Sequence, residues 1–117
     1  MKKLLSIIII VFFSSCTPIN EPKLIIENNS KITFDSIKVF TSISFPTIFY
    51  SLKPNQKAKG KVLFDVSKQG DGCYKIVIYS KGDIFKKECF GYYTNGSSLN
   101  RKFNITIEKD TIKVTSK

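Results

Sequence analysis

The sequence predicts an all-β domain: a small antiparallel sandwich of seven or eight short strands over residues 23–117. Apolar and polar residues alternate with a period of two in short runs, as in strands that bury one face. Turn-forming clusters separate these runs about every ten residues, a spacing typical of sandwiches. No stretch keeps a helical period for three turns. A small barrel is the alternative that these observations leave open.

The apolar positions define the expected strands in chain order. After a first strand that begins at Leu24, the alternating sets are Ile37/Val39/Thr41/Ile43, Ile48/Tyr50/Leu52, Val62/Phe64/Val66, Tyr74/Ile76/Ile78, the run from Ile84 to Tyr93, Phe103/Ile105/Ile107 and Ile112/Val114. Alternate side chains of a strand point to the same side of the sheet, so each set is expected to share one face. Two turns are strongly indicated: residues 53–56 have proline at the second position, and Asn95-Gly96 is a common hairpin turn.

Residues 1–15 have the order of a secretory signal peptide. Two lysines follow Met1, an apolar run spans residues 4–13, and two serines precede Cys16. As a helix, the apolar run would be about 15 Å long, which is roughly half of a bilayer core. We therefore expect a cleaved signal rather than a permanent membrane span.

The segment Phe13-Ser14-Ser15-Cys16 resembles the lipobox of bacterial lipoproteins, in a form familiar from Bacteroidota. In that family the cysteine thiol receives diacylglycerol, the chain is cleaved before the cysteine, and the new amine is acylated. The resemblance implies that Cys16 carries acyl chains such as palmitate, and that residues 16–22 tether the domain to a membrane. Each buried methylene contributes about 0.8 kcal/mol, so two or three chains anchor stably. Ordinary cleavage near Ser15, which would leave a free thiol, is the alternative.

The outline of the domain is similar to the immunoglobulin-like and transthyretin-like domains that are frequent in such lipoproteins. This resemblance includes the turn segment of residues 51–56, and it implies an architecture but not a function. Asp does not follow Cys16, and Glu21 is the only acidic residue of the tether. By resemblance to lipoprotein sorting signals, we expect the outer membrane, with the domain facing the periplasm.

The remaining cysteines, Cys73 and Cys89, are expected to form a disulfide in this oxidising compartment. A three-residue loop over residues 80–82 would place them directly opposite each other in a hairpin, within disulfide reach. Two free thiols are the alternative. A redox pair would favour CxxC spacing and a nearby histidine, and the chain has no histidine.

The lack of histidine also argues against an enzyme, because it removes the usual general base and the commonest zinc ligand. The nine Asp and Glu residues are spread over turns and outward strand positions. No loop gathers the several acidic oxygens that a calcium site needs. We therefore expect no catalytic residue, no metal and no cofactor.

The formal net charge is +10, or +8 without Lys2 and Lys3. A basic protein favours anionic partners. The lysines are nevertheless scattered rather than grouped, and their abundance also fits the usage of AT-rich coding sequence. An exported protein meets little nucleic acid, so we do not expect nucleic acid as a partner.

A candidate binding patch consists of Phe90, Tyr92, Tyr93 and, nearby, Arg101. Gly91 is expected to mark a bulge, which would redirect the neighbouring side chains. An outward tyrosine would offer a flat face to a sugar or to a protein. The alternative is that these aromatic residues simply alternate between core and surface.

Two modification sites are suggested by a further resemblance. The segments Asp35-Ser36-Ile37 and Asp110-Thr111-Ile112 resemble the acceptor of general O-glycosylation in Bacteroidota. This resemblance implies sugars on Ser36 and Thr111.

Together these features predict a lipid-anchored envelope protein that binds another envelope protein or a glycan without catalysis. The alternative is a periplasmic inhibitor or immunity lipoprotein that blocks a toxic enzyme. The loops near residues 45–46 and 69–72 would then provide its contacts.

Overall fold

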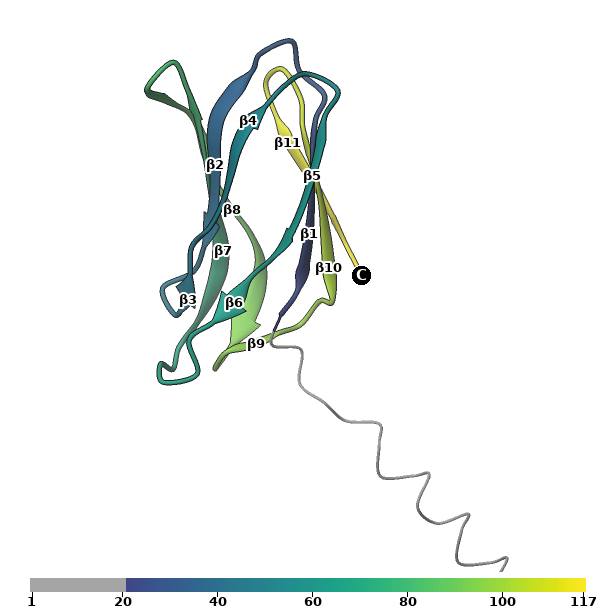
Figure 1. Ribbon diagram of the computed structural model, residues 1–117. Helices are drawn as coiled ribbons and strands as arrows, with labels where there is room; N and C mark the ends of the chain where they lie inside the picture. The colour runs from purple at the N-terminus through teal and green to yellow at the C-terminus, as the bar shows by residue number, and fades with distance from the viewer. Residues whose placement is uncertain (1–20) are drawn as a thin grey trace, which may run out of the picture.

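The computed structural model describes residues 21–117; the expected signal peptide, Cys16 and most of the tether lie outside these residues. Within them the chain forms eleven strands and no helix; nine of the strands form two facing sheets, and the other two form a short ribbon (Figure 1). The predicted β-sandwich is therefore confirmed, and the sheets do not close into one barrel. In this part of the chain, no helix is long and apolar enough to cross a membrane.

The four-stranded sheet has the spatial order β11 (Ile112–Ser116), β10 (Lys102–Ile107), β1 (Lys23–Asn28) and β5 (Lys57–Lys61). The five-stranded sheet has the order β4 (Thr47–Leu52), β2 (Phe34–Phe40), β7 (Asp71–Ser80), β8 (Asp83–Thr94) and β9 (Ser97–Ser98). A short ribbon pairs β3 (Ser44–Phe45) with β6 (Leu63–Phe64). Strands β1 and β10 are parallel, whereas the other described pairs are antiparallel.

The core between the sheets is built from alternate strand residues, as the periodicity predicts. Three predicted sets are buried throughout: Ile37/Val39/Thr41/Ile43, Tyr74/Ile76/Ile78 and Phe103/Ile105/Ile107. Leu24 and Ile26 of β1 complete the four-stranded side of this cluster. Burying one such apolar side chain contributes about 1.5–3 kcal/mol, so these sets contribute much of the favourable free energy of folding.

Two predicted sets are wrong in part. Ile48 and Tyr50 are exposed, Tyr50 by 73%, while Leu52 is buried. Ser51, between Tyr50 and Leu52, has a φ of 53°, in the left-handed region. This conformation changes which side of β4 faces the core. Val66 is 91% exposed because it lies in the loop after β6 rather than in a strand.

Tyr74 lies at the centre of an aromatic cluster, with ring centroids of Phe64, Phe90, Tyr93 and Phe103 at 4.9–6.2 Å. Its hydroxyl is buried and has no well-formed hydrogen bond within residues 21–117. Burial raises the pKa of Tyr74 to about 12, and the neighbouring Ser98 hydroxyl offsets only part of that rise. The cluster therefore holds Tyr74 as a neutral, mostly apolar group.

The Cys73–Cys89 disulfide is present, with a Cα–Cα distance of 5.8 Å. The predicted register of its hairpin is wrong. Lys81 and Gly82 both have positive φ, so they form a two-residue turn that pairs Ser80 with Asp83. As a result Lys75, not Cys73, lies opposite Cys89.

A bulge brings the two cysteines together. The register shifts once between Ile78 and Tyr79 and again between Gly72 and Tyr74. The second shift lies opposite Gly91, whose φ is +60°, so the predicted bulge at Gly91 is confirmed. The disulfide thus joins diagonal rather than directly opposite positions.

Candidate functional site

Three lysines lie in one row across three neighbouring strands of the four-stranded sheet. Lys23 of β1 is in register with Lys102 of β10 on one side and with Lys61 of β5 on the other. Neighbouring strands are about 4.8 Å apart, so the three side chains start close together. Like charges directly opposite each other destabilise a sheet. Stability of the fold therefore does not account for this lysine row.

Strand alternation turns the lysine row outward. Leu24 and Phe103, the next residues along β1 and β10, are fully buried, so Lys23 and Lys102 point away from the core. On β5 the inward position is Gly60, and a Cβ there would lie 2.8 Å from Cζ of Phe49. The missing side chain lets β5 pass close over the Phe49 ring of β4.

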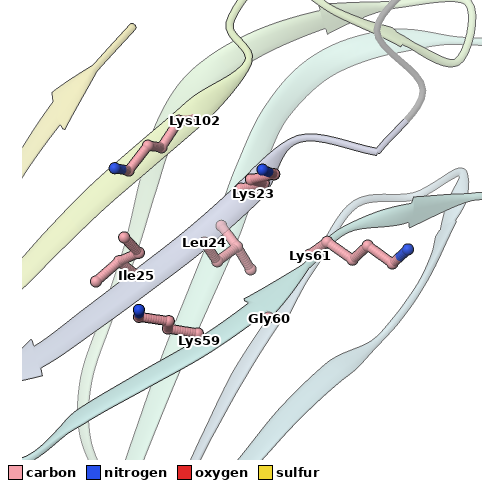
Figure 2. Close-up of a pocket in the computed structure, with 7 residues that line it drawn as sticks. All are labelled: Lys23, Leu24, Ile25, Lys59, Gly60, Lys61 and Lys102. Carbon is pink, nitrogen blue, oxygen red and sulfur yellow. The ribbon is translucent and has the colours of Figure 1, made fainter.

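The lysine row borders an open hollow of about 550 Å³ on the outer face of this sheet. Lys59 contributes a fourth ammonium group, because it lies next to Ile25 in the following row. Figure 2 shows the four lysines around Ile25, with Lys61 extending away from Lys59 and Lys102. The site therefore combines a basic rim with an apolar floor.

The positive charge of this hollow is poorly balanced. Nζ of Lys61 lies 2.9 Å from a carboxylate oxygen of Glu21, and both side chains are more than half exposed. Such a surface ion pair contributes about 0–1 kcal/mol. No ion pair among residues 21–117 involves Lys23, Lys59 or Lys102. These three lysines thus remain open to an anionic partner.

The lysine row lies where the described chain enters the domain. The amide of Val62 donates a hydrogen bond to the carbonyl of Pro22 at 3.0 Å, and the amide of Lys23 donates to the carbonyl of Arg101 at 2.9 Å. We call this end of the sandwich, with Pro22, Lys23, Val62 and Arg101, the entry end. Figure 1 shows it at the bottom of the view, with β6 and β9.

Two leucines are exposed beside these contacts. Leu63 follows Val62 and is 41% exposed, and Leu99, two residues before Arg101, is 63% exposed. An exposed leucine alone needs no explanation, but here two of them lie within two residues of Val62 and Arg101, which bond to the chain at the entry end. The entry end therefore presents apolar and basic side chains together.

The predicted aromatic patch is wrong for two of its four residues. Phe90 and Tyr93 are buried in the aromatic cluster, and Tyr93 is only 2% exposed. The Tyr93 hydroxyl lies 3.1 Å from Oγ of Ser42. The bulge at Gly91 interrupts the inward–outward alternation of β8, so the neighbouring side chains do not face the sides that a regular strand would give them. Tyr92 is exposed, and Arg101 is exposed at the entry end beside Lys23.

The two suggested acceptor sites differ in accessibility. Thr111 is exposed in the segment just before β11. Ser36 is half-buried in β2, where it is paired with Tyr50 of β4 and Tyr79 of β7. A sugar is accommodated more easily at a surface turn, so Thr111 is the better placed of the two. Modification of either residue stays a prediction.

Other polar groups form local structure rather than a site. The hydroxyl and amide of Ser67 both donate to the Asp65 carboxylate, and these bonds lower the pKa of Asp65 in an exposed turn. Residues 21–117 contain no group of three or more His, Cys, Asp or Glu side chains placed to hold a metal ion.

The lysine row is absent from the sequence-based predictions because its members are 38 and 41 residues apart along the chain. Only the pairing of three strands, one pair of them parallel, brings them into register. A lysine at the first position of two apolar strands is the one signal that the sequence offers. Comparisons with protein-family models, curated proteins and solved structures found no match to this chain.

Proposed function

We propose that this chain is a lipoprotein of the bacterial envelope, anchored through Cys16, and that its sandwich is a non-catalytic binding domain. The observation that carries this proposal is the Cys73–Cys89 disulfide in a chain that begins with a lipobox-like leader. Disulfides persist in oxidising compartments and are rare in the cytosol. The leader and the disulfide therefore support the same location, which we propose to be the periplasmic face of the outer membrane.

The anchor would hold the domain close to the bilayer. Pro22, whose carbonyl accepts a hydrogen bond from the amide of Val62, lies only six positions after Cys16. A fully extended segment of this length spans about 20 Å. The domain therefore stays within reach of membrane lipids and of other envelope components, which we propose as its partners.

The first test replaces the anchor residue. In Cys16→Ser, acylation should be lost and the protein should leave the membrane fraction after a carbonate wash, because no acyl chain remains to hold it. Intact mass spectrometry of the wild type should show a chain that starts at Cys16 and carries acyl chains. The double variant Cys73→Ala/Cys89→Ala is the matched control, since it loses two cysteines but should stay bound.

Two outcomes would contradict the anchor. One is a Cys16→Ser protein that remains in washed membranes in the same amount as the wild type. The other is a wild-type chain recovered from native cells uncut and without lipid.

An inhibitor of a toxic periplasmic enzyme is the second candidate function. It is favoured by exposed apolar side chains near the two loops singled out in the sequence: Phe45 is 56% exposed, and Val66 protrudes in the loop after β6. Protruding apolar residues are common anchors at protein interfaces. Crosslinking and pull-down of the lipidated protein from its own envelope would recover an enzyme that the purified protein inhibits.

A further inference from the structure

We propose that the entry end binds the anionic lipid surface of the membrane to which the domain is tethered. Lys23, Lys61 and Lys102 would contact lipid phosphates, and Leu63 and Leu99 would enter the headgroup region. This inference rests on the proposed lipid anchor and adds the partner that its basic site recognises. Its first support is the lysine row itself: three like charges lie in register, and among residues 21–117 only Lys61 of the three has an ion-pair partner, Glu21.

Charge complementarity favours a lipid surface. Lysines near an anionic membrane are attracted to it within a Debye length, which is about 8 Å at physiological ionic strength. The hollow beside the row is open rather than enclosed, and the row lies at the rim of the sheet, because Lys23 and Lys102 begin their strands and Lys61 ends β5. A flat array of phosphates can approach such a rim, whereas a small soluble anion would find no walls to hold it.

The position of the tether favours the same partner. Pro22 is hydrogen-bonded to Val62 and Lys23 to Arg101, so the described chain enters the domain beside the two segments that carry the exposed leucines. With Cys16 in the bilayer, this is the end nearest to the lipid. Tethering raises the effective concentration of a weak contact to about the millimolar range, so a modest affinity suffices to orient the domain.

Docking of the entry end would fix which surfaces face outward. In Figure 1 the β7–β8 turn and the β4–β5 and β10–β11 connections lie at the opposite end of the sandwich. Thr111, in the β10–β11 connection, would then point away from the membrane. The proposal thus separates a lipid-facing end from an end that is free to meet other partners.

The test measures lipid binding without the acyl anchor. All eleven described strands and their core lie within residues 21–117, so a chain from residue 16 onward with Cys16→Ser keeps the complete sandwich. Its binding is measured to vesicles of phosphatidylcholine alone and to vesicles that also contain phosphatidylglycerol. We expect salt-sensitive binding to the anionic vesicles only. Because this protein carries no lipid, the result is independent of whether Cys16 is acylated in cells.

The decisive variant is Lys23→Gln/Lys61→Gln/Lys102→Gln. Each lysine near an anionic surface changes binding about fivefold, so the triple variant should bind about 100-fold more weakly. Lys75→Gln/Lys87→Gln/Lys109→Gln is the matched control: it removes the same charge from exposed positions away from the entry end and should bind nearly as well as the wild type. Leu63→Ser/Leu99→Ser should weaken binding to the anionic vesicles at low salt, while the salt dependence of that binding stays the same because all the lysines remain.

Three outcomes would overturn the proposal. The first is no binding of the parent protein to anionic vesicles at low salt. The second is an equal loss in the row variant and in the control, which would mean that only net charge matters. The third is binding to soluble polyphosphate without binding to vesicles, which would assign the lysine row to a soluble polyanion. Thermal unfolding of each variant verifies that the sandwich is intact.

Discussion

The two sheets of this sandwich differ in the regularity of their strand pairing. In the four-stranded sheet every described pair keeps an unbroken register, and plain alternation places a row of lysines on the outer face. The five-stranded sheet contains two register shifts, a left-handed Ser51 and the disulfide. Regular pairing is enough to present charges, whereas the bulge at Gly91 lets the backbone of β8 fit against the aromatic cluster. We therefore expect substitutions at the breaks of the five-stranded sheet to change stability, and substitutions of the outward lysines of the four-stranded sheet to change binding.

The two sheets approach each other closely under the β8 bulge. A Cβ on Gly91 would lie 2.8 Å from Cε1 of Phe103 and 3.1 Å from Cδ2 of Tyr74. Phe103 belongs to the four-stranded sheet and Tyr74 to the five-stranded one. The bulge thus lets the backbone of one sheet approach an aromatic ring of the other.

The largest expected effect comes from Gly91→Ala, which should lower the free energy of unfolding by about 3 kcal/mol. About 1–2 kcal/mol is the cost of a side chain in the left-handed region, and overpacking against Phe103 adds about 1–3 kcal/mol. Urea denaturation followed by fluorescence or circular dichroism measures the change. Gly82→Ala is the matched control, since Gly82 has a φ of +81° and nothing within 4 Å of the added Cβ. It should cost only about 1 kcal/mol. Equal losses in the two variants would show that the ring contact is loose.

Loss of the disulfide should have the next largest effect. Cys73→Ala/Cys89→Ala should lower the free energy of unfolding by about 2–3 kcal/mol, because the bridge no longer restricts the unfolded chain. A reducing agent should destabilise the wild type by a similar amount and leave the double variant unchanged. Binding to anionic vesicles should not change, because the lysine row lies on the other sheet. A double variant as stable as the oxidised wild type would contradict the structural role of the bridge.

The regularity of the strand pairing also determines which features of the fold could be predicted from the sequence. Strands without breaks were predicted correctly: Phe103, Ile105 and Ile107 share the buried face. The disulfide partners were identified from the number of cysteines and the expected compartment. Predictions became wrong where an ordinary residue takes a left-handed conformation. Ser51 reverses the face of β4, and Lys81 shortens the hairpin turn from three residues to two. Neither residue type favours this conformation, so the sequence carries no signal for it.

The candidate site was missed for a different physical reason. Each lysine of the row follows the predicted alternation, and nothing about any one of them is unusual. Their proximity arises from long-range pairing, including a parallel pair between the first strand and a strand near the end of the chain. Periodicity determines the face on which a residue lies but not its neighbour on the next strand. The aromatic patch, in contrast, was singled out from adjacent residues, and the bulge divided it between core and surface.

The smallest effect at neutral pH is expected for Tyr74→Phe. Its buried hydroxyl makes no well-formed hydrogen bond among the described residues, so removing it should change the free energy of unfolding by less than about 1 kcal/mol. In alkaline solution the difference should grow. The unfolded tyrosine ionises near pH 10, but burial raises the pKa of Tyr74 to about 12 in the folded chain. Between these values the unfolded state binds fewer protons, so wild-type stability falls as the pH rises.

Tyr74→Phe removes the group responsible, so the variant should be less sensitive to this rise in pH. A difference of about two pKa units corresponds to about 2–3 kcal/mol between variant and wild type near pH 12. Urea denaturation at pH 7, 10 and 12 measures it, with the two proteins compared at each pH so that the titration of lysines cancels. If both proteins lose stability in parallel above pH 10, then Tyr74 ionises as freely in the folded chain as in the unfolded one. The aromatic cluster would then admit water, and the five-stranded sheet would not be the closely packed side of the sandwich.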